Sequence, residues 1–181
     1  MKTWDVGFLR ANPPDSQRAL IILNQPFCPG LLRRLWNSCA WRCCADGGAN
    51  RLYDLFSAPD FVDCGTSRAR SRYLPDLIKG DLDSIREDVR AYYTSLGVPV
   101  IKDEDQDSTD LMKCVFEIQK REQSEQSQQE IILLGGLSGR LDQTIHTLSY
   151  LHKLHTTRPY VFAVTDDNVA WVLGAVPGPC S

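Results

Sequence analysis

The sequence lacks any apolar run that approaches the roughly 20 residues needed to span a bilayer. Its first residues, MKTWDVGFLRANPPDS, lack the apolar core of a secretory signal peptide. Positive charge is not in excess either, because the formal net charge is −3 and the basic residues are scattered. We therefore expect a cytoplasmic protein with no general affinity for nucleic acid or anionic membranes.

A disulfide or zinc framework is also lacking. The seven cysteines are an odd number without regular spacing, which predicts reduced thiols. Cys39, Cys43 and Cys44 lie close enough to suggest zinc, but no second Cys/His pair follows at zinc-finger spacing. We expect them to be small buried hydrophobes. The sequence also contains no internal repeat and no Ser/His/Asp or Cys/His catalytic arrangement.

The 181 residues, 43% apolar and 24% charged, suffice for one domain with a sizeable core. Short apolar runs alternate with helical patterns along most of the chain. The predicted strands are 18–25, 41–48, 75–81, 98–102, 130–136, 160–166 and 168–176. The predicted helices are 30–40, 49–56, a segment between Ser84 and Gly97, a segment from Leu111 that fades into the polar stretch 121–130, and 138–155. The polar segment 57–72 is predicted to be an exposed insertion.

Two of the helices carry specific signals. Ser84 and Glu87 have the spacing of a capping box, and Gly97 stands where a helix-ending glycine is expected. The stripe predicted to face the core between them consists of Ile85, Val89, Tyr92 or Tyr93, and Leu96. The residues predicted to face inward from helix 138–155 are Leu141, Ile145, Leu148 and Leu151.

Strands that are apolar on both faces and alternate with helices predict an α/β fold. We expect a Rossmann-like three-layer domain with a mostly parallel sheet. Ligands of such sheets bind beyond the carboxyl ends of the strands. Four polar motifs follow predicted strands and should therefore meet at one sheet edge: ADGGAN (45–50), GDLDS (80–84), DEDQDSTD (103–110) and GGLSGRLD (135–142).

The segment KDEDQDSTDLMK (102–113) places five carboxylates between Asp103 and Asp110, with no cation among them before Lys113. Like charges at this spacing repel, so they need water, basic side chains from elsewhere, or a metal ion as counter-charge. Asp103 and Glu104 fit a solvated loop best. The plausible helix N-caps in the run are Asp107, Ser108 and Thr109.

Asp81 and Asp83 stand two residues apart at a strand end, so both carboxylates can face one ion. Mg²⁺ prefers such oxygen ligands, although Asp83 and Ser84 also suit a helix start. If Asp110 joins the two aspartates across neighbouring strand ends, a Mg²⁺ site forms and the repulsion is relieved.

The turns ADGGAN and LGGLSGR lead from a strand into a helix, where backbone N–H groups can approach a phosphate. Neither matches GxGxxG or GxxxxGK[ST]. Arg140 could hold a phosphate, and Lys113 could do the same or form a plain surface pair with Asp110. From the residues alone, we expect a Mg²⁺-carboxylate site beside glycine turns, suited to phosphoryl-type transfer on a nucleotide.

Four blocks, CADGGANRLYDL, IKGDLDSIREDVRAYY, DQDSTDLMKC and LGGLSGRLDQ, occur in order within about residues 18–175. Together they resemble the thiamine pyrophosphokinase family, in particular its animal members. The resemblance implies Mg²⁺-dependent transfer of the pyrophosphoryl group of ATP to the hydroxyl of thiamine, giving thiamine diphosphate and AMP. The attacking hydroxyl meets the β-phosphorus.

The resemblance also assigns residues. The implied metal ligands are Asp81, Asp83 and Asp110, which with Asp107 form the implied catalytic set. The implied ATP- and thiamine-binding shell consists of Asp46, Gly47, Gly48, Ser84, Gln106, Thr109, Lys113, Gly136, Arg140, Asp142 and Gln143.

Members of this family continue into a β-rich C-terminal domain that helps form a homodimer and closes the thiamine pocket. We expect residues 1–17 to be an N-terminal extension, 18–176 the ATP- and Mg²⁺-binding domain and 177–181 a truncated tail, with the β-rich domain absent. The alternative is a truncated, non-catalytic isoform that retains nucleotide binding or pairs with a full-length partner. A DxD phosphatase with Asp81 as nucleophile is a weaker hypothesis, because it gives GGLSGRLDQ no role.

Overall fold

The chain forms one seven-stranded sheet, in the order β4-β3-β2-β1-β5-β6-β7, in a computed structural model that describes residues 6–10, 17–56 and 70–174. Its neighbouring strands run parallel except for the last pair, β6 and β7. The strands are β1 (Arg18–Ile22), β2 (Trp41–Ala45), β3 (Leu77–Gly80), β4 (Val100–Lys102), β5 (Glu130–Leu134), β6 (Val161–Val164) and β7 (Val169–Ala170).

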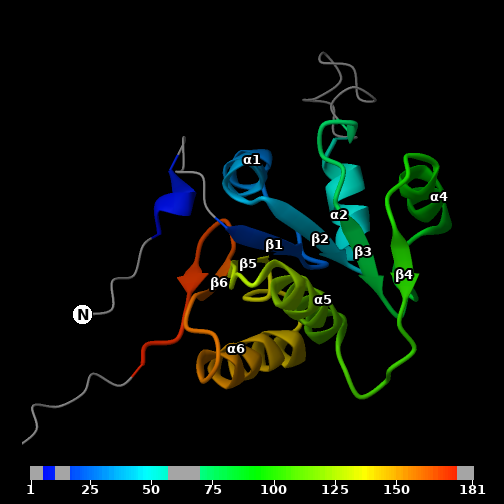
Figure 1. The fold of residues 1–181 in the computed structure, drawn as a ribbon. Coiled ribbons are helices and arrows are strands. Elements are labelled where there is room, and N and C mark those ends of the chain that lie inside the picture. The colour runs from blue at the N-terminus through cyan, green and yellow to red at the C-terminus, as the bar shows by residue number, and fades with distance from the viewer. Residues whose placement is uncertain (1–5, 11–16, 57–69, 175–181) are drawn as a thin grey trace, which may run out of the picture.

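Helices cover both faces of the sheet (Figure 1). One face carries α1 (Pro29–Ser38), α2 (Gly48–Leu55) and α4 (Glu87–Ser95). The other face carries α5 (Asp110–Glu125) and α6 (Leu141–His155). The predicted three-layer α/β fold with a mostly parallel sheet is therefore confirmed.

The central strand β1 shows why the sheet needs a layer on each side. Ala19 and Ile21 belong to the hydrophobic cluster beneath α5 and α6, whereas Leu20 and Ile22 belong to the opposite cluster. All four side chains are fully buried. Successive strand residues point to opposite faces, so a continuous apolar run requires two covering layers. Phe8, which lies in the predicted N-terminal extension, is also buried in the core. It packs on Phe162, with the two ring centroids 5.0 Å apart.

The predicted start of α4 is wrong. The helix begins at Glu87 after Arg86, and the side chain of Ser84 donates to Asp83 instead of capping the helix. The backbone N–H groups of Ser84 and Ile85 are held by the carboxylate of Asp46, which keeps this stretch out of the helix. Leu96, predicted to face inward, is 44% exposed, whereas Gly97 ends the helix region with φ of +81° as predicted.

The predicted inward face of α6 is also largely wrong. Leu141, Ile145 and Leu148 are 71%, 57% and 46% exposed, and among the four predicted residues only Leu151 is buried. The buried face of the helix carries Thr147, Leu151 and Leu154, of which the two leucines belong to the cluster against the sheet. The helix is therefore rotated so that its first two apolar turns face away from the described part of the core.

The cysteine prediction is confirmed wherever the structure describes it. Cys39, Cys43 and Cys44 are buried free thiols. Burial raises the pKa of Cys39 to about 11, as expected for a thiol that serves as a small hydrophobe. Most of the predicted insertion, 57–69, lies outside the described residues. Among the described helices, none has the length and apolar character required to cross a membrane.

Candidate functional site

A pocket of about 430 Å³ lies at the carboxyl ends of the parallel strands. Each of the four polar motifs contributes to its wall, through Asp46, Ser84, Asp110 and Gly136 among others. The strand-to-helix loops of a parallel sheet all emerge at one edge, which is why Asp46 and Gly136, 90 positions apart in the sequence, converge here. The expectation that they share one edge is confirmed.

Asp46 is the most buried carboxylate of the site, with 2% of its surface exposed. It follows β2 in a left-handed conformation (φ +39°), which turns the chain sharply toward α2. Its two carboxylate oxygens accept the backbone N–H groups of Ser84 (2.9 Å) and Ile85 (3.0 Å). Burial raises the pKa of Asp46 despite these bonds, and the neighbouring charge of Asp81 adds to the rise.

Asp46, Asp81 and Asp83 each offer a carboxylate oxygen, and these oxygens lie within 4.8 Å of one another. Asp110 joins them from α5, because its Oδ1 accepts the backbone N–H of Asp81 at 3.1 Å. We call these four residues the carboxylate group. Gly80 makes this approach possible, since a Cβ there would lie 2.7 Å from Asp46 Cβ and 2.8 Å from Asp110 Oδ1.

The counter-charges of the acidic run come partly from basic side chains of the core. Lys79 pairs with Asp103 at 3.2 Å and with Glu117 at 2.7 Å. Asp103 is therefore ion-paired, which corrects the expectation of a simply solvated residue. Lys113 Nζ lies 3.7 Å from Asp110 Oδ1; Lys113 is 4% exposed, whereas the side chain of Asp110 is 29% exposed, so this is not the plain surface pair that was one of the two alternatives for Lys113.

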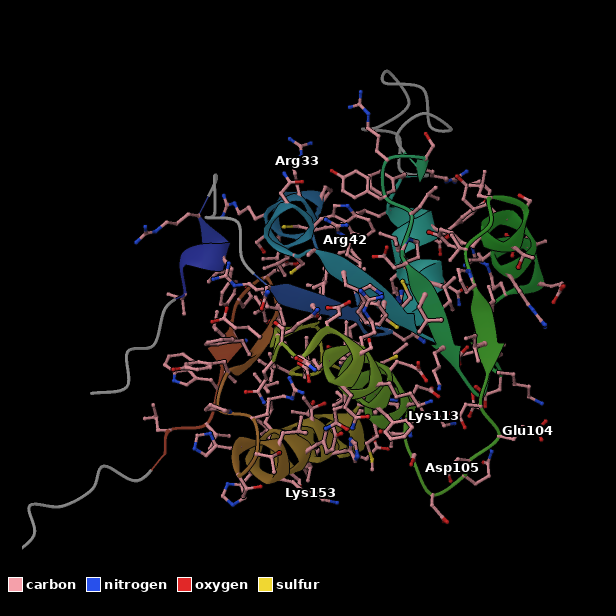
Figure 2. The ribbon with its side chains drawn as sticks, in the orientation of Figure 1. Arg33, Arg42, Glu104, Asp105, Lys113 and Lys153 are labelled. Carbon is pink, nitrogen blue, oxygen red and sulfur yellow. The ribbon has the colours of Figure 1, made fainter. Side chains whose placement is uncertain are left out.

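The middle of the acidic run projects away from the pocket. Glu104 and Asp105 lie on the loop from β4 to α5 (Figure 2), and Glu104 pairs with Lys102 at 3.0 Å. Gln106 and Asp107 are exposed on the same loop and are not among the residues that line the pocket. Their predicted roles gain no support from their position.

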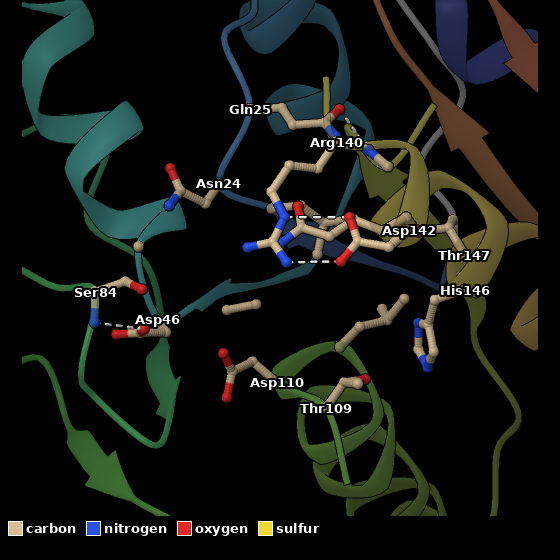
Figure 3. A pocket seen from close by; sticks show the side chains of 16 residues that line it. Asn24, Gln25, Asp46, Ser84, Thr109, Asp110, Arg140, Asp142, His146 and Thr147 are labelled. Carbon is tan, nitrogen blue, oxygen red and sulfur yellow. Dashed lines mark hydrogen bonds and ion pairs between the residues drawn. The ribbon is translucent and has the colours of Figure 1, made fainter. Parts of the chain in front are cut away.

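The facing wall is formed by the β5–α6 loop and the first turns of α6. Arg140 and Asp142 form a bidentate ion pair, with Nε–Oδ1 and Nη2–Oδ2 distances of 3.1 and 2.6 Å. Figure 3 shows this pair across the pocket from Asp46 and Asp110. Arg140 is the N-cap residue of α6 and makes no side-chain capping bond. The positive end of the helix dipole therefore lies at the pocket without a side-chain cap.

The predicted site residues divide into three sets. Those that line the pocket are Asp46, Gly47, Ser84, Thr109, Asp110, Gly136, Arg140, Asp142 and Gln143. Asp81 and Asp83 lie beside it within the carboxylate group. Those that do not line it are Gly48, which packs against the backbone of Ile22, the loop residues Gln106 and Asp107, and the buried Lys113, which pairs with Asp110.

The sequence interpretation missed four polar residues of the wall: Asn24, Gln25, His146 and Thr147. Asn24 and Gln25 were assigned to the first strand, but β1 ends at Ile22. A polar pair directly after an apolar run was the available signal. Thr147 carried no such signal, because a threonine within a helical pattern is usually an ordinary surface residue.

The carboxylate group suits a hard divalent cation. Three carboxylates within 4.8 Å of one another repel unless a cation or protons neutralise them. Oxygen donors of this kind are those that Mg²⁺ takes, commonly from one or two carboxylates plus substrate phosphates. The residues present therefore fit Mg²⁺ bound together with a phosphorylated ligand.

We expect Asp110→Asn to stabilise the metal-free protein at neutral pH. Burial raises the pKa of Asp110, and the charges of Asp81 and Asp46 raise it further. A carboxyl whose pKa is higher in the folded than in the unfolded state adds to the free energy of unfolding at low pH. This contribution is complete below the pKa of the unfolded state, about 4, and is lost as pH rises through the pKa of the folded state. At pH 7 the charged form therefore costs stability, and Asn keeps the bond from Asp81. A gain of about 1–4 °C in Tm is expected.

Thermal unfolding in a chelator at pH 7 and pH 3.5 measures this effect. The gain should shrink at pH 3.5, where Asp110 of the wild-type chain is itself protonated. An equal gain at both values would show that charge is not its cause.

Comparison with known proteins identifies relatives along most of the chain. A family model described as thiamin pyrophosphokinase, catalytic domain, matches residues 32–163. The chain is 43% identical over 158 residues to thiamine pyrophosphokinase 1 of Arabidopsis thaliana, across 86% of this chain and 57% of that relative. It is 38% identical over 166 residues to thiamine pyrophosphokinase 1 of Oryza sativa subsp. japonica, across 90% of this chain and 61% of that relative.

Solved structures agree with these relatives. Thiamin pyrophosphokinase from Candida albicans superposes with a TM-score of 0.71 at 30% identity, across 83% of this chain and 58% of that one. The yeast thiamin pyrophosphokinase gives a TM-score of 0.70 at 30% identity, across 87% and 61%. The chain spans about three fifths of the length of these relatives. Because the family model covers most of its residues, the chain belongs to the thiamin pyrophosphokinase family.

Proposed function

We propose that the chain binds Mg²⁺-ATP in this pocket and transfers the pyrophosphoryl group to thiamine, giving thiamine diphosphate and AMP. The hydroxyl oxygen of thiamine bonds to the β-phosphorus and gives up its proton to solvent, the bond from that phosphorus to the α-phosphate oxygen breaks, and AMP leaves with that oxygen. The observation that carries the proposal is the carboxylate group facing an N-terminus of α6 without a side-chain cap. This arrangement occurs in a chain of the thiamin pyrophosphokinase family.

Opposite charges meet across the pocket in a way that suits a metal-bound polyphosphate. On one side, Asp81, Asp83 and Asp110, with Asp46 beside them, would hold Mg²⁺. Bound there, Mg²⁺ would supply the positive charge that neutralises the phosphates.

On the other side, Arg140 and the first turn of α6 offer N–H donors to the phosphates. Arg140 is held in place by Asp142, whose pKa is lowered by the hydrogen bonds from that guanidinium. The pair fixes the direction of an otherwise mobile side chain. Gln143 and Thr109 add polar groups to the same wall. The proposed roles are thus positioning and charge neutralisation, which account for most of the catalysis in phosphoryl transfer.

The test is release of AMP from ATP by the isolated chain with Mg²⁺ present, measured with and without thiamine. We expect AMP that depends on both thiamine and Mg²⁺. Bound Mg²⁺-ATP without thiamine-dependent AMP would instead support a chain that retains the nucleotide site and needs further protein for turnover. Absence of Mg²⁺-ATP binding would overturn the proposal.

A further inference from the structure

Gln25 lies where the strand-to-helix loops of β1 and β5 separate. These two strands are neighbours, yet the chain leaves β1 toward α1 on one face of the sheet and leaves β5 toward α6 on the other. Such a switch point opens a crevice at the edge of a parallel sheet, and the pocket described above occupies it. The width of the pocket therefore depends on what joins the two loops.

The side chain of Gln25 joins them. It is 6% exposed, and its Oε1 accepts hydrogen bonds from the backbone N–H of Gly136 at 2.8 Å and from Ser138 Oγ at 3.1 Å. Its Nε2 donates to the backbone carbonyl of Ser138. Both ends of one amide are thus used on a single loop, and Figure 3 shows Gln25 beside Arg140 at that wall of the pocket.

The β5–α6 loop needs such support because of its backbone. Gly135, Gly136 and Gly139 have φ of +107°, +86° and +80°, which favours glycine at each position. Three glycines in five residues give the loop high conformational freedom, so bonds from outside must select its conformation. Gly136 also fits tightly against Thr147, since a Cβ there would lie 2.9 Å from that side chain.

We propose that Gln25 is a positioning residue for the nucleotide: it holds residues 135–140 so that Arg140 and the first turn of α6 stay at a fixed distance from the carboxylate group. The inference rests on the proposed function, since it assigns the phosphates to the space between these two walls. Gln25 acts through the loop, and its own polar atoms are committed to Gly136 and Ser138.

The variant Gln25→Met tests this role, because methionine keeps the unbranched length and apolar stem but provides no strong hydrogen bonds. Gln129→Met is the matched control. Gln129 is equally buried, with 6% of its surface exposed, and is not among the pocket residues. It directly precedes β5, at the end of that strand opposite to the β5–α6 loop. Gln25→Met should lose thermal stability because three hydrogen bonds are removed, so loss of stability alone does not test the positioning role.

Titration calorimetry with Mg²⁺-ATP provides the first readout. We expect Gln25→Met to raise the Kd for Mg²⁺-ATP by about tenfold, because a displaced wall loses several aligned contacts at once. Its affinity for Mg²⁺ alone should be unchanged, and the Kd of Gln129→Met for Mg²⁺-ATP should stay within about twofold of wild type. A wild-type Kd in Gln25→Met, or an equal rise in both variants, would overturn the inference.

Amide hydrogen exchange provides a readout that does not depend on the nucleotide. In Gln25→Met the amide of Gly136 should exchange on the order of tenfold faster, whereas Gln129→Met should leave it unchanged. If the wild-type chain fails to bind Mg²⁺-ATP, the proposed function falls. In that case exchange at Gly136 still decides whether Gln25 holds the loop, and unchanged protection there would refute that part of the inference.

Discussion

Asp81→Asn should weaken Mg²⁺-dependent ATP binding by about 100-fold, equivalent to ~3 kcal/mol. Asp81 offers a carboxylate oxygen within 4.8 Å of those of Asp46 and Asp83, and the substitution removes its charge with little change of shape. In a chelator, where ATP meets only the carboxylates, the same variant should bind ATP no more weakly than wild type, because one repulsive charge is gone. Calorimetry with and without Mg²⁺ measures both effects.

Glu104→Gln is the control for this prediction. It removes one negative charge from the same acidic region. The side chain of Glu104, however, is 80% exposed on the β4–α5 loop and pairs with Lys102. Its affinity for Mg²⁺-ATP should stay close to that of wild type. An equal loss in Glu104→Gln would mean that the general acidic field matters and not a specific site. Unchanged affinity in both Asp81→Asn and Asp110→Asn would refute the assignment of the carboxylate group.

The fold could be predicted from the sequence because its signals are local and redundant. The run from Arg18 to Ile22 is buried on both faces, and such a strand is stable only between two layers. The order of the strands did not follow from these patterns. Whether β5 pairs with β1 or with β4 depends on how the helices pack, and no single segment carries that information.

The face of α6 shows what periodicity leaves open. Leu141, Ile145 and Leu148 do form a stripe at helical spacing, but the stripe is exposed among the described residues. The buried face instead carries Thr147, whose side chain lies against Gly136 of the β5–α6 loop. An apolar stripe thus predicts that a helix is amphipathic, but it does not determine which face packs inward, since that depends on contacts with distant parts of the chain.

The site was predictable to the extent that it follows strand ends. Asp46, Asp81 and Asp110 meet because each stands just beyond a strand or at the start of the next helix. The position of Gln106 could not be predicted in this way, because a side chain on a loop of several residues can point in many directions. Gln25 was missed because its importance lies in long-range bonds to Gly136 and Ser138, over 100 residues away.

Gly48→Ala should destabilise the fold by about 3 kcal/mol and lower Tm by about 6–12 °C. A Cβ at this position would lie 2.2 Å from the backbone oxygen of Ile22 and 2.9 Å from its carbonyl carbon. Ile22 belongs to β1, which is paired on both sides by β2 and β5 and cannot shift alone. The start of α2 would have to move away from the sheet and take Asp46 with it. Chemical denaturation of the purified variant measures the loss.

Gly30→Ala provides the opposite expectation for the same chemical change. Gly30 lies in the first turn of α1, where an added Cβ would meet only the sulfur of Cys28 at 3.9 Å, an ordinary contact. Alanine there should be neutral or stabilise the fold by about 0.5 kcal/mol, because it restricts the unfolded chain. Equal effects of Gly48→Ala and Gly30→Ala would mean that α2 can retreat from β1 at little cost. In that case the turn conformation, and not the close contact between α2 and β1, would explain why position 48 is a glycine.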